Sequence, residues 1–156
     1  MSVSELIQQY AAGPELLRAT VAGMPREELL ARPVPGKWST MEVIAHMADT
    51  EPLYAERIKR VVCEDQPTLF ALDPDTYVAK LPYQQRDLET ELTFIEATRR
   101  HMLPLLLALS PADFERTGRH SADGPLTAAT LLQRIVGHIP HHIAFIREKR
   151  AAIARG

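Results

Sequence analysis

The stretch IVGHIPHHIAFI, residues 135–146, decides the fold, because its apolar residues recur every three or four positions. That spacing places them on one face of an α-helix. His138 and His142 share this face, about one helical turn apart. An imidazole is costly to bury unless another group binds it. The stretch therefore predicts a long helix that carries two paired histidines into the protein interior.

A second stretch, VIAHMADTE at residues 43–51, also places a histidine, His46, on an apolar helical face. A divalent metal ion would bind all three imidazoles at once, and three neutral imidazoles leave a coordination position open for chemistry. We therefore expect His46, His138 and His142 to converge on one ion. His141 is an alternative to His142, because residues three positions apart also share a helix face. Without a metal, each of the three buried rings would need a partner of its own.

Four long segments show helical periodicity, and connectors rich in proline or glycine separate them. The segments cover residues 3–23, 39–63, 86–109 and 127–150. No stretch gives a convincing strand pattern. Four amphipathic helices with such connectors indicate the all-α class and a four-helix bundle, in a single domain that spans the whole chain.

The expected helix starts carry capping residues. Ser2 with Glu5, and Ser39 with Glu42, form the serine–glutamate spacing of a capping box, in which each side chain bonds a free backbone amide of the first turn. Thr127 is the expected N-cap of the last helix. These residues fix where three of the four helices begin.

The connectors are expected to hold short extra helical turns. MPREELL (24–30) and SPADF (110–114) each contain a proline near the start of such a turn. Residues 64–85 are long for a structureless loop, so we expect them to pack and to border a substrate pocket. Residues 115–125 are expected to form a loop.

Two acidic residues, Asp49 and Glu51, lie within about a turn and a half of His46. Either carboxylate would be placed to orient a ligand ring through its second nitrogen or to assist catalysis near the ion. The alternative for each is a solvated surface carboxylate. Gly137 and Pro140, beside the paired histidines, indicate a close approach and a local distortion of the helix.

The composition excludes several classes of protein. The chain has 156 residues, of which 46% are hydrophobic and 24% charged, which is the balance of an ordinary globular protein. The formal net charge is −2 and no long basic tract occurs, so we expect no nucleic-acid partner. No apolar run reaches about 18 residues, so no membrane partner is expected. A single cysteine forms no internal disulfide, and we expect a cytoplasmic protein.

The stretches GKWSTMEVIAHMADTE (36–51) and IVGHIPHHIAFIREKR (135–150) resemble the two histidine motifs of the DinB/YfiT-like superfamily. The resemblance implies a four-helix bundle that is often a homodimer. It also implies a divalent ion, usually nickel or zinc, bound at the positions of His46, His138 and His142. Imidazole ligands alone do not separate these metals from iron or manganese. The chain departs from similar proteins at Ile139, where an acidic residue is common, and at Pro140.

Three functions follow from this reading. The leading one is thiol transfer, because some branches of the superfamily attach low-molecular-weight thiols to small-molecule electrophiles, and a metal ion lowers the pKa of a bound thiol. The second is a metal-dependent hydrolase with Glu51 or Asp49 near the ion. The third is a metal-binding or dimerisation module without catalysis, which a fourth protein ligand would favour.

Overall fold

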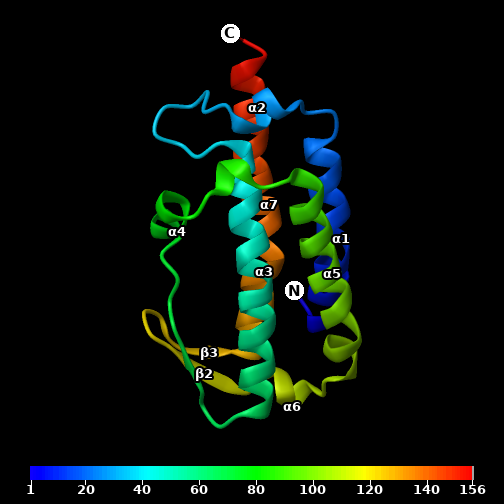
Figure 1. Cartoon of the computed structure of the whole chain (residues 1–156). Coiled ribbons are helices and arrows are strands. Elements are labelled where there is room, and N and C mark those ends of the chain that lie inside the picture. Colours follow the sequence, from blue (N-terminus) through cyan, green and yellow to red (C-terminus); the bar gives the residue numbers. More distant parts are fainter. Residues whose placement is uncertain (156) are drawn as a thin grey trace.

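Four long helices form the frame of the computed structural model, which describes residues 1–155 (Figure 1). They are α1 (Val3–Val21), α3 (Thr40–Cys63), α5 (Leu88–Ala108) and α7 (Ala128–Ile153). Helices α1 and α3 each pack against both α5 and α7, so the four helices close into a ring. The all-α four-helix bundle predicted from the sequence is confirmed.

The helix directions explain the long connector between α3 and α5. The colour order in Figure 1 shows that α1 and α7 run one way and that α3 and α5 run the other. Because α3 and α5 are parallel neighbours, the chain must return along the bundle between them. This return carries α4 (Pro74–Lys80) and the 3₁₀ turn η1 (Tyr83–Gln85), and both pack against α3. The expectation that this connector packs is therefore met.

The capping residues lie where the sequence places them. Ser39 Oγ accepts a hydrogen bond from the amide of Glu42 at 3.1 Å, and Thr127 Oγ1 accepts one from the amide of Thr130 at 3.0 Å. The short helices α2 (Arg26–Leu30) and α6 (Pro111–Phe114) occupy the two predicted positions. The prolines inside the long helices do not end them, so α1 continues through Pro14.

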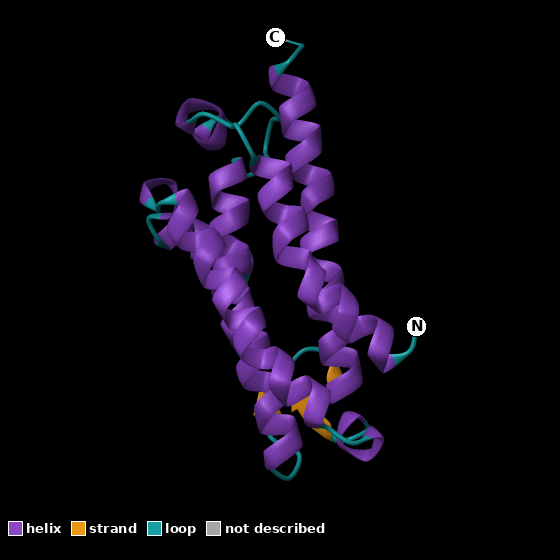
Figure 2. Cartoon of the chain, turned by 90° about the vertical axis from the view of Figure 1, so that its right-hand side faces the viewer, coloured by secondary structure: helices purple, strands orange, loops and turns teal. Residues whose placement is uncertain are grey.

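The prediction that the chain lacks strands was wrong in two connectors. β1 (Thr68–Leu69) pairs in parallel with β2 (Thr117–His120), which pairs antiparallel with β3 (Gly124–Thr127). Strands of two to four residues are too short to show an alternating pattern in the sequence. Gly118 permits the packing, because a Cβ there would lie 2.8 Å from Cγ2 of Val61. Figure 2 shows the strands at one end of the bundle, where they hold the expected loop against α3.

One buried ion pair joins all four helices. The guanidinium of Arg99 on α5 donates to both oxygens of Glu51 on α3, at 3.0 Å from Nε and 2.6 Å from Nη2. It also donates to the carbonyls of Tyr10 on α1 and Ile135 on α7, both at 2.9 Å. Gly13 on α1 leaves space for the guanidinium, since a Cβ at this position would overlap it. The ion pair lies between the two apolar clusters of the core.

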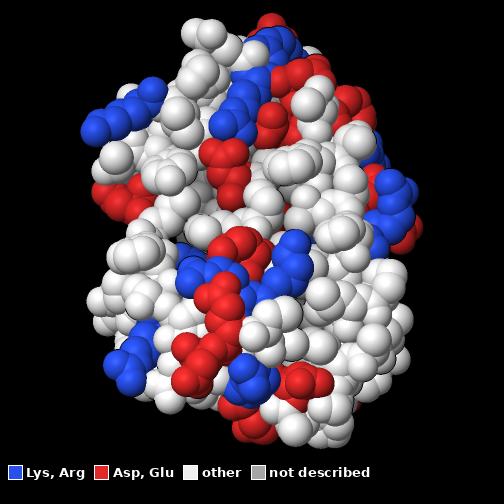
Figure 3. Space-filling model, turned by 60° about the horizontal axis from the view of Figure 1, so that its bottom comes forward, with Lys and Arg blue, Asp and Glu red and all other residues white. Residues whose placement is uncertain are grey.

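The surface shows no broad patch of one charge on the face drawn in Figure 3, where acidic and basic side chains are interspersed. Across the described residues, no helix combines the length and the hydropathy needed to cross a bilayer.

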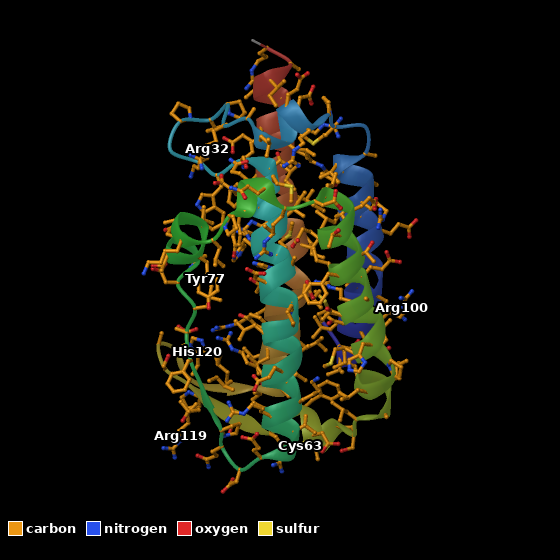
Figure 4. The ribbon with its side chains drawn as sticks, in the orientation of Figure 1. Arg32, Cys63, Tyr77, Arg100, Arg119 and His120 are labelled. Atoms are coloured by element: carbon orange, nitrogen blue, oxygen red, sulfur yellow. The ribbon has the colours of Figure 1, made fainter. Side chains whose placement is uncertain are left out.

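Replacing Arg99 by methionine tests the role of the ion pair. The substitution leaves the Glu51 carboxylate buried without a counter-charge, so we expect the free energy of unfolding to fall by about 3–5 kcal/mol. Urea denaturation followed by circular dichroism measures it. Arg100→Met is the matched control, because Arg100 is exposed and points away from the bundle in Figure 4, and its effect should stay within about 0.5 kcal/mol. Equal losses of unfolding free energy in the Arg99 and Arg100 variants would contradict a stabilising role of the buried ion pair.

Candidate metal centre

The three predicted histidines meet between α3 and α7. Nε2 of His138 lies 3.1 Å from Nε2 of His46 and 3.0 Å from Nε2 of His142. One nitrogen from each ring lies within 4.8 Å of the others. His141 is exposed and lies outside this group. The structure therefore assembles the three histidines that the sequence singled out.

The spacing of the nitrogens fits one divalent ion. With metal–nitrogen bonds of about 2.0–2.1 Å, two ligand nitrogens lie about 3.3 Å apart in a tetrahedral site and about 2.9 Å apart at a right angle. The observed distances of 3.0 and 3.1 Å fall between these values. Nε2 of a neutral ring offers either one proton or one lone pair, so His138 cannot form good hydrogen bonds with both neighbours. A cation that accepts three lone pairs resolves this conflict.

The rings are also in the right protonation state. Burial, with a smaller contribution from the neighbouring histidines, lowers the pKa of His138 to about 2 and that of His142 to about 3. Burial lowers the pKa of His46, while the charges of Asp49 and Asp75 oppose that shift. All three rings are therefore neutral near pH 7, as metal ligands must be.

The two acidic residues near His46 bond other groups. Glu51 lies five positions from His46, which turns it about 140° around the helix, and Arg99 binds both of its oxygens. Burial raises the pKa of Glu51, and the charge of Arg99 opposes the rise. Asp49 accepts a hydrogen bond from Tyr83 at 2.6 Å and one from Arg86 at 2.8 Å. Neither carboxylate bonds a histidine ring, so their catalytic roles stay predictions.

The outer nitrogens of the histidine pair on α7 carry no protein partner within residues 1–155. Among the described residues, Nδ1 of His138 and Nδ1 of His142 are buried without a hydrogen bond. In the part of the chain that the structure describes, no other segment makes the close approach expected at Gly137, since no protein atom lies within 4 Å of a Cβ built there. The alternative, close approach of a ligand, stays a prediction. Pro140 lies inside an uninterrupted α7. No hydrogen bond from the described chain to Nδ1 therefore orients these two rings.

Two cavities flank the histidines. The first has a volume of about 230 Å³ and includes His46 and His138 in its wall, and the second, of about 340 Å³, includes His142. The start of α4 separates them, because Pro74 lines the first cavity and Asp75 lines the second. The predicted border of a pocket by the 64–85 connector is confirmed. The histidine cluster thus borders two cavities.

The cavity walls contain residues that the sequence did not indicate. His120, in the stretch 115–125 that was expected to form a loop, lies on β2, and its side chain is 9% exposed. It lines the first cavity, on the side of α3 that faces the connector (Figure 4). Trp38 lines the second cavity, with its ring centroid 5.3 Å from that of His46. These positions result from long-range packing, for which no local sequence pattern exists.

Comparison with known proteins finds relatives whose names describe them as metal-dependent. The sequence model of the DinB superfamily matches residues 9–146. A protein of Oceanobacillus iheyensis named "Putative metal-dependent hydrolase" is 30% identical over 144 residues, which cover 92% of this chain and 83% of the relative. A protein of Geobacillus thermodenitrificans with the same description is 29% identical over 152 residues, covering 95% and 84%.

Two solved structures share the fold. YfiT from Bacillus subtilis, described as a probable metal-dependent hydrolase with an unusual four-helix bundle topology, superposes with a TM-score of 0.92 at 23% identity. The match covers 99% of this chain and 90% of YfiT. A mycothiol-dependent maleylpyruvate isomerase superposes with a TM-score of 0.72 at 11% identity, over 92% of this chain and 60% of the isomerase.

The neutral rings predict a stability that depends on pH. In chelator-treated protein, the pKa values of His138 and His142 lie below the unfolded value of about 6.5. The unfolded chain therefore binds more protons as the pH falls below 6.5, and stability is lost progressively down to the folded pKa values. Each neutral ring should lower the free energy of unfolding by at most about 2 kcal/mol between pH 7 and pH 5.

Urea denaturation of chelator-treated protein at pH 7 and pH 5 measures this loss. His138→Gln removes one such ring. The free energy of unfolding that this variant loses between the two pH values should therefore be smaller than in the unchanged protein, by up to about 2 kcal/mol. His101→Gln is the control, because His101 is exposed on α5. An identical loss in the His138 variant would contradict the assignment of a buried neutral ring.

Proposed function

This chain belongs to the DinB superfamily, and we propose that it is a metal-dependent hydrolase in which three histidines hold one divalent ion. The observation that carries the proposal is the convergence of Nε2 of His46, His138 and His142 beside two cavities. The names of the relatives agree with it. When bound, the ion, which we propose to be nickel or zinc, lowers the pKa of a bound water and polarises a substrate carbonyl.

The first cavity is the proposed substrate site. Two of the three ligand rings face it, and its wall carries polar groups from four segments. These groups include Thr50 and Arg57 of α3, His120 of β2 and Arg134 of α7. Hydrolysis adds hydroxide to the carbonyl carbon of an ester or amide and transfers a proton to the leaving group. The wall residues bind and orient the molecule in which this bond breaks.

Asp75 is the proposed proton acceptor. It lines the second cavity together with His142, one of the three proposed ligands. Within residues 1–155, no hydrogen bond or ion pair to its side-chain oxygens is found. Asp123, the acidic residue of the first cavity, is bound by Arg134 at 2.5 Å. Asp75 is thus the unpaired carboxylate of the two cavities, and we assign it to take a proton from water that approaches the histidines through the second cavity, as a general base does.

Thiol transfer is the second candidate, and the pair of cavities favours it. Hydrolysis needs one organic substrate besides water, whereas transfer of a low-molecular-weight thiol needs space for both the thiol and its electrophile. His142 opens onto one cavity, and His46 and His138 open onto the other. The fold shared with a mycothiol-dependent isomerase is consistent with this alternative.

Metal analysis of protein purified without a histidine tag tests the ligand set. We expect about one ion per chain in the unchanged protein and loss of most of it in His138→Ala, because two imidazoles bind far more weakly than three. His141→Ala is the matched control, since it removes a neighbouring imidazole of the same helix that lies outside the group. Full retention of the ion by His138→Ala would refute the assignment.

Trp38 supplies a second readout of the same binding. It is the only tryptophan of the chain and lies beside His46. Titration of chelator-treated protein with Ni²⁺ should therefore quench its fluorescence, and His138→Ala should shift the midpoint to higher Ni²⁺ concentration. An unchanged midpoint would contradict binding at this site.

Activity assays separate the candidate functions. Release of product from activated esters and amides, lost on chelation and restored by metal, supports the hydrolase. Metal-dependent consumption of a small thiol with a general electrophile supports transfer instead. Metal retention with neither activity supports a binding module.

A further inference from the structure

Arg57 is a buried cation without an acidic partner. It is 4% exposed, whereas the other buried arginine, Arg99, is 1% exposed and paired with Glu51. Among residues 1–155 no carboxylate forms an ion pair with Arg57, and its Nε has no hydrogen-bond partner. Its Nη2 donates to the carbonyl of Phe70, and its guanidinium lies 5.1 Å from the ring centroid of Tyr54. A buried charge left in this state is costly, so an anion is the missing partner.

Arg57 lies in the wall of the first cavity, which also contains His46 and His138. Two other fully charged side chains line that wall, Asp123 and Arg134, and they neutralise each other. Burial and the nearby charge of Arg57 lower the pKa of His120, which keeps that ring neutral. One positive charge therefore remains uncompensated at this end of the cavity. It matches a ligand group with a single negative charge, such as a carboxylate.

The position of Arg57 on α3 sets the length of the ligand. Arg57 follows His46 by three helical turns, which corresponds to about 16 Å along the helix axis. Thr50 and Tyr54 line the cavity between them. A molecule that reaches both ends is therefore elongated, with its anionic group roughly 10 Å or more from the ligand nitrogens.

We propose that the substrate is an elongated carboxylate whose anionic end pairs with Arg57 while its reactive bond lies at the three histidines. The assignment of the carboxylate end depends on Arg57 alone, whereas the assignment of the reactive end depends on the proposed function. Arg57 is a specificity-determining residue, because a guanidinium binds a carboxylate through two parallel hydrogen bonds and rejects uncharged analogues.

Ligand-observed NMR titration with hexanoate tests the carboxylate end. Chelator-treated protein is used, so that hexanoate cannot bind a metal ion, and 1-hexanol serves as the uncharged analogue. We expect hexanoate to bind more tightly than 1-hexanol. We also expect its Kd to rise about tenfold or more in Arg57→Gln and by less in Arg57→Lys, which keeps the charge.

Arg60→Gln is the matched control, since Arg60 lies on the same helix and bonds Glu64 outside the cavity. Its hexanoate Kd should equal that of the unchanged protein. A thermal melt of each variant checks the fold, and Arg57→Lys keeps the test decisive if Arg57→Gln unfolds. Equal hexanoate binding by the Arg57 variants and the unchanged protein would overturn the proposal.

Two further outcomes also overturn it. Binding of 1-hexanol as tight as that of hexanoate would show an apolar site, and tighter, Arg57-dependent binding of inorganic phosphate would show a phosphate site. Because hexanoate is tested without metal, loss of the metal-dependent activity and loss of carboxylate binding are observed separately.

Discussion

The guanidinium of Arg99 is the contact on which the rest of the structure depends. It extends from α5, bonds Glu51 on α3, and reaches backbone carbonyls of Tyr10 on α1 and Ile135 on α7. Glu51 follows His46 by five residues, and Ile135 precedes His138 by three. The axial register of α3 against α7 is therefore set at a point about a turn and a half from the histidines. These hydrogen bonds form only at set distances and angles, and so in one packing register, whereas apolar contacts are non-directional.

The order of helix directions gives this bundle its site. Two parallel neighbours, α3 and α5, require a return segment along the length of the bundle (Figure 1), and residues of that segment line the same cavities as the histidines. Its helix α4 divides the space above them into two cavities. The three-stranded sheet ties the return segment to the loop before α7 and brings His120 to the first cavity. Access to the three histidines is thus a consequence of topology.

The sequence predicts what depends on local spacing. The four helices, their caps and the three histidines follow from a period of 3.6 residues and from residues three or four apart, and the structure contains them. The strands, Asp75 and Arg57 depend on contacts between distant segments, and no local pattern encodes these. Glu51 shows the difference plainly, because proximity to His46 in sequence suggested a role at the ion, while five residues of helix turn it toward Arg99.

Anomalous diffraction from crystals of the nickel-loaded protein, recorded at the nickel absorption edge, tests the central claim most directly. The account predicts one strong peak between α3 and α7, about 2.0–2.2 Å from Nε2 of His46, His138 and His142. A peak bonded to fewer than two of these rings, or located elsewhere in the chain, would contradict it.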